Sequence, residues 1–193
     1  MIGRPLVELL MRAGAEVRIA SLDDPSLAYP GTEFFYLDLT KLDNCLKACN
    51  GVDIVFHLAS IKGSPKVMME KPASFFTTIV LLNANMMEAA RLNQVEWFLY
   101  TSTVGVYSPA EVFYEDDVWK GLPSEHDKFA GWAKRMGELQ AAAYAIQYGK
   151  NNISIVRPAN VYGPYDDFDS EGAMVIPSLI KRAVRGEDPF VKK

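Results

Sequence analysis

The sequence contains few residues of the kinds that build disulfides, metal sites or membrane spans. Its 193 residues include two cysteines and two histidines. Cys45 and Cys49 lie four residues apart in an expected helix, which is poor geometry for a disulfide, so we expect free core thiols and no metal site. No run of about eighteen apolar residues is present, and the N-terminus lacks the charged and apolar blocks of a signal peptide. These absences favour a cytoplasmic protein without a membrane partner.

The sequence also lacks an excess of positive charge. With 20 Lys and Arg against 24 Asp and Glu, the formal net charge is −4 at pH 7. Such a protein has no electrostatic attraction for nucleic acid or for an anionic membrane, so neither is an expected partner. The length and the hydrophobic content of 49% are sufficient for one globular domain with a complete core.

Strand-like and helix-like segments alternate along the chain. Strands are expected at residues 16–20, 32–37, 52–59, 97–101 and 153–157. Helices are expected at residues 5–13, 40–49, 72–93, 129–148 and 174–185. Strands separated by helices pair in parallel through right-handed crossovers, so the pattern predicts an α/β fold with a doubly wound parallel sheet. The longest irregular stretch, residues 108–128, carries six acidic residues and is expected to be a solvated loop.

The beginning of the chain resembles the second half of a dinucleotide-binding turn. Gly3 stands where the third glycine of such a turn lets the helix pack closely on the sheet, although a plain helix N-terminus fits the same residue. The first strand and the first two glycines would then lie upstream of residue 1. Because the first strand is central in a sheet ordered 3-2-1-4-5-6, its omission predicts a gap between the strands at 16–20 and 52–59. We therefore expect a fragment of a longer protein, with residues 188–193 ending before a second domain.

Four segments in a fixed order carry a resemblance to a known family. They are FHLA at 56–59, YTSTVGVY at 100–107, the helix at 129–138 and RPANVYGP at 157–164. Together they resemble the extended short-chain dehydrogenase/reductase family, the NAD(P)-dependent nucleotide-sugar epimerases, dehydratases and reductases. The resemblance implies one NAD(P)-binding Rossmann-like domain over residues 1–193, lacking the first strand and the C-terminal substrate domain. It also implies an enzyme whose partner is a nucleotide-activated sugar.

The family divides hydride-transfer chemistry among a Ser or Thr, a Tyr and a Lys. The resemblance places the hydroxyl on Thr103 and the lysine on Lys134, which would hold the nicotinamide ribose and lower the pKa of the tyrosine. The position of the tyrosine is Ala130, which cannot exchange a proton. Conceivable substitutes near the site in sequence are Tyr107, Tyr114, Glu125, His126 and Asp127. A non-catalytic NAD(P)-binding module is the alternative function, and an engineered tyrosine-to-alanine change fits the sequence equally well.

Two further positions narrow the expected reaction. Residues 160–168 followed by 174–182 resemble GDP-L-fucose synthase, which is expected to epimerise its substrate with a cysteine and a histidine. The matching residues are Gly105 and Met174, and neither can take or give a proton. The resemblance therefore favours a reductase, a dehydratase-like enzyme or another epimerase. His57, at the end of a buried strand, is expected to be structural or cofactor-adjacent rather than a catalytic base.

The resemblance also implies the residues that hold cofactor and substrate. Ser21, at the end of the second strand of the fold, is small and leaves room for a 2′-phosphate, which favours NADP over NAD, although Asp23 and Asp24 are close. The other expected ligands of the cofactor are Gly3, Asp38, Leu39, Leu58, Ala59, Lys134, Pro158 and Asn160. Expected contacts with the substrate are Thr103, Asn160 and Arg182, the last of which pairs a diphosphate or is simply a surface charge.

The same family suggests how copies of the chain associate. Two long helices from each subunit commonly form a four-helix dimer interface. Here these helices would be residues 72–93 and 129–148, and apolar residues on their outer faces are compatible with a homodimer.

Overall fold

Two parallel sheets form the centre of the molecule. The computed structural model describes residues 1–61, 63, 65–149, 151–168 and 173–187. β1 (Arg18–Ser21) pairs with β2 (Glu33–Tyr36), while β3 (Ile54–His57), β4 (Trp97–Thr101) and β5 (Ile153–Val156) form a separate sheet in the order β3-β4-β5. No strand in the described ranges joins β1 to β3. Both the predicted α/β class and the predicted gap are therefore confirmed.

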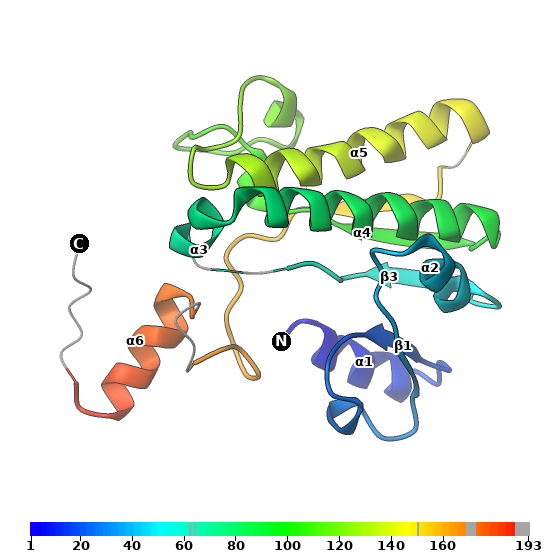
Figure 1. Cartoon of the computed structure of the whole chain (residues 1–193), viewed down its shortest axis with the longest axis horizontal. Helices are drawn as coiled ribbons and strands as arrows, with labels where there is room; N and C mark the ends of the chain where they lie inside the picture. Colours follow the sequence, from blue (N-terminus) through cyan, green and yellow to red (C-terminus); the bar gives the residue numbers. More distant parts are fainter. Residues whose placement is uncertain (62, 64, 150, 169–172, 188–193) are drawn as a thin grey trace.

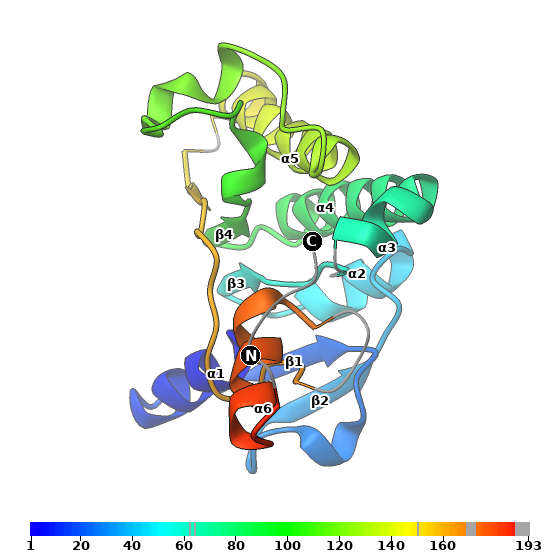
Figure 2. The same ribbon diagram turned by 90° about the vertical axis from the view of Figure 1, so that its left-hand side faces the viewer.

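Helices connect the strands at nearly every position predicted from the sequence. They are α1 (Gly3–Arg12), α2 (Leu42–Cys49), α3 (Pro65–Glu70), α4 (Pro72–Leu92), α5 (Lys128–Tyr148) and α6 (Val175–Val184). The short helix α3 was not predicted. Figure 1 shows α4 and α5 side by side across one face of the three-stranded sheet. Figure 2 shows α1 at the left of β1 and α2 at its right. None of these described helices is long and apolar enough to cross a membrane.

The main core lies between the three-stranded sheet and helices α2, α4 and α5. Alternate residues of a strand share one face, so Val55 and His57 of β3 point to the same side as Phe98 and Tyr100 of β4, and all four are buried. The helices supply the other core side chains, which include Cys45, Cys49, Met86, Met87, Ala89 and Ala90. The prediction that both cysteines are free core thiols is confirmed.

A glycine turns the chain from α1 into β1. Gly14 follows the end of the helix with φ +85°. This is the left-handed region, which glycine adopts without the steric penalty of a Cβ, so Gly14 suits the end of the helix.

The acidic loop at residues 108–128 is more structured than the sequence predicts. Its segment Glu115–Trp119 forms a 3-10 helix, and Val118 is buried in a small cluster with Val106 and Tyr107. The buried side chain of Arg135 on α5 anchors the loop, because Nε donates to the Val106 carbonyl (2.8 Å) and Nη1 to the Gly121 carbonyl (2.6 Å). The loop is therefore fixed against the start of α5 rather than freely solvated.

Candidate active site

Lys134 lies at the carboxyl end of the three-stranded sheet. Its Nζ donates a hydrogen bond of 2.7 Å to the carbonyl of Thr101, the last residue of β4. Lys134 is only 7% exposed, and this burial lowers the pKa of its ammonium group to about 8. An ammonium has three donors, so the bond to Thr101 leaves two for other acceptors.

Thr103 follows β4 by two residues. Its Oγ1 accepts a hydrogen bond of 3.2 Å from the backbone N–H of Gly105 and thereby caps the 3-10 turn Val104–Val106. Because the hydroxyl oxygen acts as the acceptor in this bond, its proton remains to be donated. The structure thus brings a hydroxyl donor and a buried ammonium to the same strand end.

Behind Lys134, a buried chain of polar groups fixes its backbone. Tyr100 donates from its hydroxyl to the Lys134 carbonyl (3.0 Å) and accepts from Asn83 Nδ2 (2.9 Å). Asn83 Oδ1 lies 3.0 Å from His57 Nε2. Burial, and then the nearby charge of Lys134, lower the pKa of His57 to about 4. His57 is therefore neutral near pH 7 and holds Asn83 in place, a structural position of the kind expected from the sequence.

A buried ion pair ties α5 to the ends of β4 and β5. Arg157 donates from Nε and Nη2 to the two carboxylate oxygens of Glu138 at 2.9 and 2.8 Å, and Ser102 Oγ donates to Glu138 at 2.5 Å. Glu138 raises the pKa of Arg157, chiefly through these hydrogen bonds. The remaining guanidinium nitrogen donates to the Tyr107 hydroxyl (2.9 Å), so Tyr107 is engaged as part of this structural cluster.

The sequence analysis missed Glu138, although a signal was present. Lys134 and Glu138 are four residues apart, and both lie on the face of α5 that carries the buried residues Gly137 and Ala141. Charged residues on a buried helical face need partners of opposite charge, so the position of Glu138 on this face could have pointed to a buried ion pair.

The expected cofactor residues near the N-terminus are only partly brought together. A Cβ built on Gly3 would lie 3.7 Å from Leu58 Cδ1, which places the start of α1 beside the segment after β3. This is an ordinary van der Waals contact, so the described residues do not require glycine at position 3. Ala59, the next residue, packs against the main core.

The residues at the ends of β1 and β2 are already engaged in local hydrogen bonds. Ser21 Oγ donates to Asp23 at 2.8 Å. Asp38 accepts from the backbone and the hydroxyl of Thr40 at 3.0 and 2.7 Å, and these bonds lower the pKa of its carboxyl group. Leu39 is 6% exposed and lies in the core, so its side chain is directed away from solvent.

The remaining expected residues lie on both sides of the strand ends. The Pro158 carbonyl accepts from Val104 N–H at 3.1 Å, which brings Pro158 beside the turn that begins at Thr103. Asn160 is exposed. Helix α6, which carries Arg182, stands apart from α4 and α5 in both views (Figures 1 and 2).

Two of the expected cofactor residues carry charged groups whose chemistry suits parts of a dinucleotide. The Lys134 ammonium suits ribose hydroxyls, and the Asp38 carboxylate suits the amino group of an adenine. No three acidic, histidine or cysteine side chains of the described residues are grouped so that they could hold a metal ion.

A cavity of about 230 Å³ lies beside Ala130. We call it the Ala130 cavity, and its lining residues are Met68, Met69, Phe75, Glu125, His126, Lys128, Phe129 and Ala130.

Two of the residues considered as substitutes for the tyrosine, Tyr114 and Asp127, do not line this cavity. Tyr114 is 64% exposed on the acidic loop. Asp127 packs over Gly105, where a Cβ would lie 3.1 Å from the Asp127 Cγ, so a cysteine at position 105 would fit tightly against this carboxylate.

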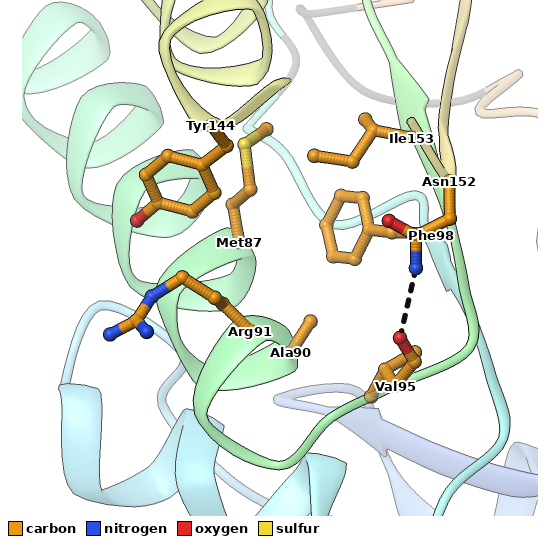
Figure 3. A pocket seen from close by; sticks show the side chains of 8 residues that line it. All are labelled: Met87, Ala90, Arg91, Val95, Phe98, Tyr144, Asn152 and Ile153. Atoms are coloured by element: carbon orange, nitrogen blue, oxygen red, sulfur yellow. Dashed lines mark hydrogen bonds between the residues drawn. The ribbon is translucent and has the colours of Figure 1, made fainter. Parts of the chain in front are cut away.

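A second cavity is too small to hold a substrate. It measures about 20 Å³ and lies between α4, α5 and the amino ends of β4 and β5 (Figure 3). Met87, Phe98 and Ile153 form part of its apolar wall, and Asn152 beside it donates to the Val95 carbonyl at 3.1 Å. A space of this size holds about one water molecule, and it lies at the opposite end of the strands from Thr103 and Lys134.

Comparisons with known proteins agree with this geometry. The model of the NAD dependent epimerase/dehydratase family matches residues 1–193. GDP-mannose 3,5-epimerase 1 of Oryza sativa subsp. japonica is 29% identical over 164 residues, which cover 82% of this chain and 42% of that protein. GDP-L-fucose synthase of Sinorhizobium fredii is 32% identical over 114 residues, which cover 58% of this chain and 36% of that protein. The chain thus spans less than half the length of these relatives.

Solved structures of nucleotide-sugar enzymes share the fold. UDP-glucose 4-epimerase of Thermus thermophilus, in complex with NAD, superimposes with a TM-score of 0.81 at 26% identity, over 97% of this chain and 60% of that one. A GDP-D-glycero-L-gluco-heptose synthase from Campylobacter jejuni, solved in the presence of NADPH, gives a TM-score of 0.73 at 21% identity, over 92% of this chain and 50% of that one. The Rossmann-like class and the family resemblance inferred from the motifs are confirmed.

Proposed function

Because the chain belongs to the NAD-dependent epimerase/dehydratase family, we propose that it binds NAD(P) and acts on a nucleotide-activated sugar. The observation that carries this proposal is the position of Lys134. Its largely buried ammonium donates to the carbonyl of Thr101 at the end of β4, and Thr103 follows Thr101 by two residues. A bound nicotinamide would supply or accept the hydride, and the residues of the chain would orient the reacting groups.

Each polar group at the strand end has one task in this proposal. Lys134 holds the ribose hydroxyls with the two donors that Thr101 leaves available. Thr103 donates its hydroxyl proton to the sugar oxygen at the reacting carbon and so fixes its orientation. Pro158 and Asn160 face the nicotinamide and the sugar from the segment after β5. The ion pair of Glu138 with Arg157 keeps α5 at the distance from β4 that these contacts need.

Ala130 sets the limit on turnover. Loss of a positioned general acid or base lowers a rate by about 10² to 10⁴. The proposed action on a nucleotide-activated sugar is tested by stopped-flow absorbance of the nicotinamide. The full-length protein and its Ala130→Tyr variant are each mixed with a panel of GDP-, UDP- and dTDP-sugars. Hydride transfer with one of these sugars supports the proposal. Its absence from both proteins rejects it.

The second candidate is a non-catalytic NAD(P)-binding module. The observation that favours it is Ala130, since an alanine at this position supplies no proton. A titration that follows nicotinamide fluorescence distinguishes the two functions. Tight cofactor binding combined with no hydride transfer in either protein assigns the module, whereas transfer in the unmodified protein assigns the enzyme.

For the cofactor we propose NADP. The small Ser21 side chain at the end of β1 leaves room for a 2′-phosphate. The Asp23 carboxylate, bonded to Ser21, opposes this preference because it would repel a phosphate. We therefore expect a lower Kd for NADPH than for NADH and a larger preference in Asp23→Asn. A preference for NADH in both proteins rejects NADP.

We also propose that two copies associate through α4 and α5. Large apolar side chains point outward from both helices, with Leu81 on α4 40% exposed and Leu139 and Ile146 on α5 52% and 88% exposed. Analytical ultracentrifugation is expected to give a dimer, and Leu139→Glu is expected to give a monomer. A protein that is monomeric before any substitution contradicts this arrangement.

A further inference from the structure

The Ala130 cavity has an apolar side and a polar side. Met68 and Met69 of α3 and Phe75 of α4 form the apolar side. Glu125, His126 and Lys128, from the turn before α5 and its first residue, form the polar side. Binding sites of small molecules commonly combine an apolar wall with a few convergent polar groups, so this space suits part of a substrate.

Two of the three polar residues are paired with each other. Lys128 Nζ donates to Glu125 Oε2 at 3.4 Å, which partly cancels the charge of both groups. In the part of the chain that the structure describes, no side chain hydrogen-bonds the exposed imidazole of His126. The other acidic group nearby, Asp127, accepts from Ser124 Oγ at 3.2 Å and packs over Gly105. Among these residues, His126 is therefore the one whose proton-exchanging side chain forms no hydrogen bond with another described side chain.

The position of His126 relates it to Ala130 and Lys134. A hydrogen bond of 2.6 Å from Gly131 N–H to the Asp127 carbonyl continues the helical pattern to the residue beside His126. His126 lies in the turn just before α5, two residues ahead of its first residue, while Ala130 and Lys134, spaced by four, share a face of the helix. His126 and Ala130 line the same cavity, so a sugar that entered this space would meet the imidazole as well as the methyl group of Ala130.

From this arrangement we infer that His126 exchanges the proton of the sugar oxygen in place of a tyrosine at position 130. The inference rests on the proposed function. Imidazole is the side chain best suited to give and take a proton near neutrality.

The proton and the electrons balance in either direction. In reduction, the carbonyl carbon of the sugar gains the hydride that a reduced nicotinamide supplies, and the carbonyl oxygen takes the proton from the imidazolium of His126. A hydroxyl forms, His126 becomes neutral, and the cofactor is left oxidised. In oxidation, neutral His126 takes the hydroxyl proton as the hydride leaves the carbon.

The test uses the full-length protein with His126→Gln, His126→Ala and Glu111→Gln. Glu111 is an exposed carboxyl elsewhere on the acidic loop and serves as the control. Hydride transfer in His126→Gln is expected to fall by about 10² to 10⁴ with little change in KM. Added imidazole is expected to restore transfer in His126→Ala, while Glu111→Gln is expected to leave kcat unchanged. A structural role for His126 would not give rescue by imidazole.

A second readout does not depend on turnover. In a ¹⁵N-histidine spectrum, the signal that is absent from His126→Gln is expected to shift when the nucleotide sugar binds in the presence of oxidised cofactor. An unchanged kcat in His126→Gln, a loss that imidazole does not restore, or an unshifted signal overturns the inference. Transfer that occurs only in Ala130→Tyr overturns it while leaving the proposed function intact. Transfer in neither the unmodified protein nor Ala130→Tyr rejects both.

Discussion

Gly137 is the position at which a single added methyl group should disturb both the fold and the site. A Cβ built on Gly137 would lie 2.4 Å from the Tyr100 hydroxyl oxygen and 2.5 Å from its Cζ. Both distances are shorter than any van der Waals contact, so Tyr100 must move. Tyr100 is 0% exposed, and its hydroxyl connects Asn83 with the Lys134 carbonyl. Gly137→Ala should therefore displace the group that fixes the backbone of Lys134.

One stabilising and two destabilising effects set the change in the free energy of unfolding. Replacing a helical glycine by alanine stabilises a helix by about 1 kcal/mol. Overpacking of a core costs about 1 to 3 kcal/mol. If Tyr100 loses both hydrogen bonds, each contributes a further loss of about 0.5 to 1.5 kcal/mol. The free energy of unfolding is therefore expected to fall by about 1 to 5 kcal/mol, even though alanine is the better helix former.

Urea unfolding followed by tryptophan fluorescence measures this change. Ala142→Gly, at an exposed position of the same helix, is the control for helix propensity and is expected to lose about 1 kcal/mol. Tyr100→Phe combined with Gly137→Ala removes the nearest clashing atom, so the double variant should lose less than the two single losses added together. A Gly137→Ala protein that is as stable as its parent would refute the close contact between Tyr100 and α5.

Three further predictions concern the buried charged and polar groups. Glu138→Gln leaves the Arg157 guanidinium without its carboxylate and is expected to lower the free energy of unfolding, measured by urea unfolding, by about 3 to 5 kcal/mol. A loss below about 1 kcal/mol contradicts a buried ion pair. Lys134→Met is expected to abolish hydride transfer while raising the free energy of unfolding at pH 7 by up to about 3 kcal/mol, since burial lowers the pKa of Lys134 from 10.5 to about 8. This gain should shrink between pH 8 and 10.5, where the folded protein has already released the proton and the unfolded chain has not. Folding lowers the pKa of His57 from 6.5 to about 4, so the unfolded chain binds more protons than the folded protein between pH 4 and pH 6.5. The free energy of unfolding should therefore decrease as pH is lowered through this range. Urea unfolding from pH 7 to pH 4 should show a smaller dependence on pH in His57→Asn.

The sequence was sufficient for the regular elements because each carries a local signal. β4 was predicted with both of its ends correct, and α5 was predicted to within one residue at its start. The helix α3 was missed because its six residues are too few to show helical periodicity. The 3-10 helix Glu115–Trp119 was missed because its acidic residues indicate solvent, whereas Val118 and the distant Arg135 hold the segment in place.

The candidate site divides in the same way. Thr103 and Lys134 could be named from motifs, because each motif is a short local sequence. The pairings that support this strand end could not be named, since Glu138 meets Arg157 across 19 residues and Asn83 meets Tyr100 across 17 residues of chain. The contact of Asp127 with Gly105 depends on how the acidic loop folds back, and no local spacing indicates it.

The supports of Lys134 are independent of residue 130, and this makes Ala130→Tyr an informative substitution. Tyr100 holds the Lys134 backbone, the Thr101 carbonyl holds its ammonium, and Glu138 holds the next turn of α5. None of these contacts involves the side chain at position 130, which instead borders a cavity of about 230 Å³. A phenol ring can enter this space without displacing the core, so the substitution should leave the free energy of unfolding nearly unchanged. A change in hydride transfer on Ala130→Tyr then reports on the chemistry of the proton and not on the position of the lysine.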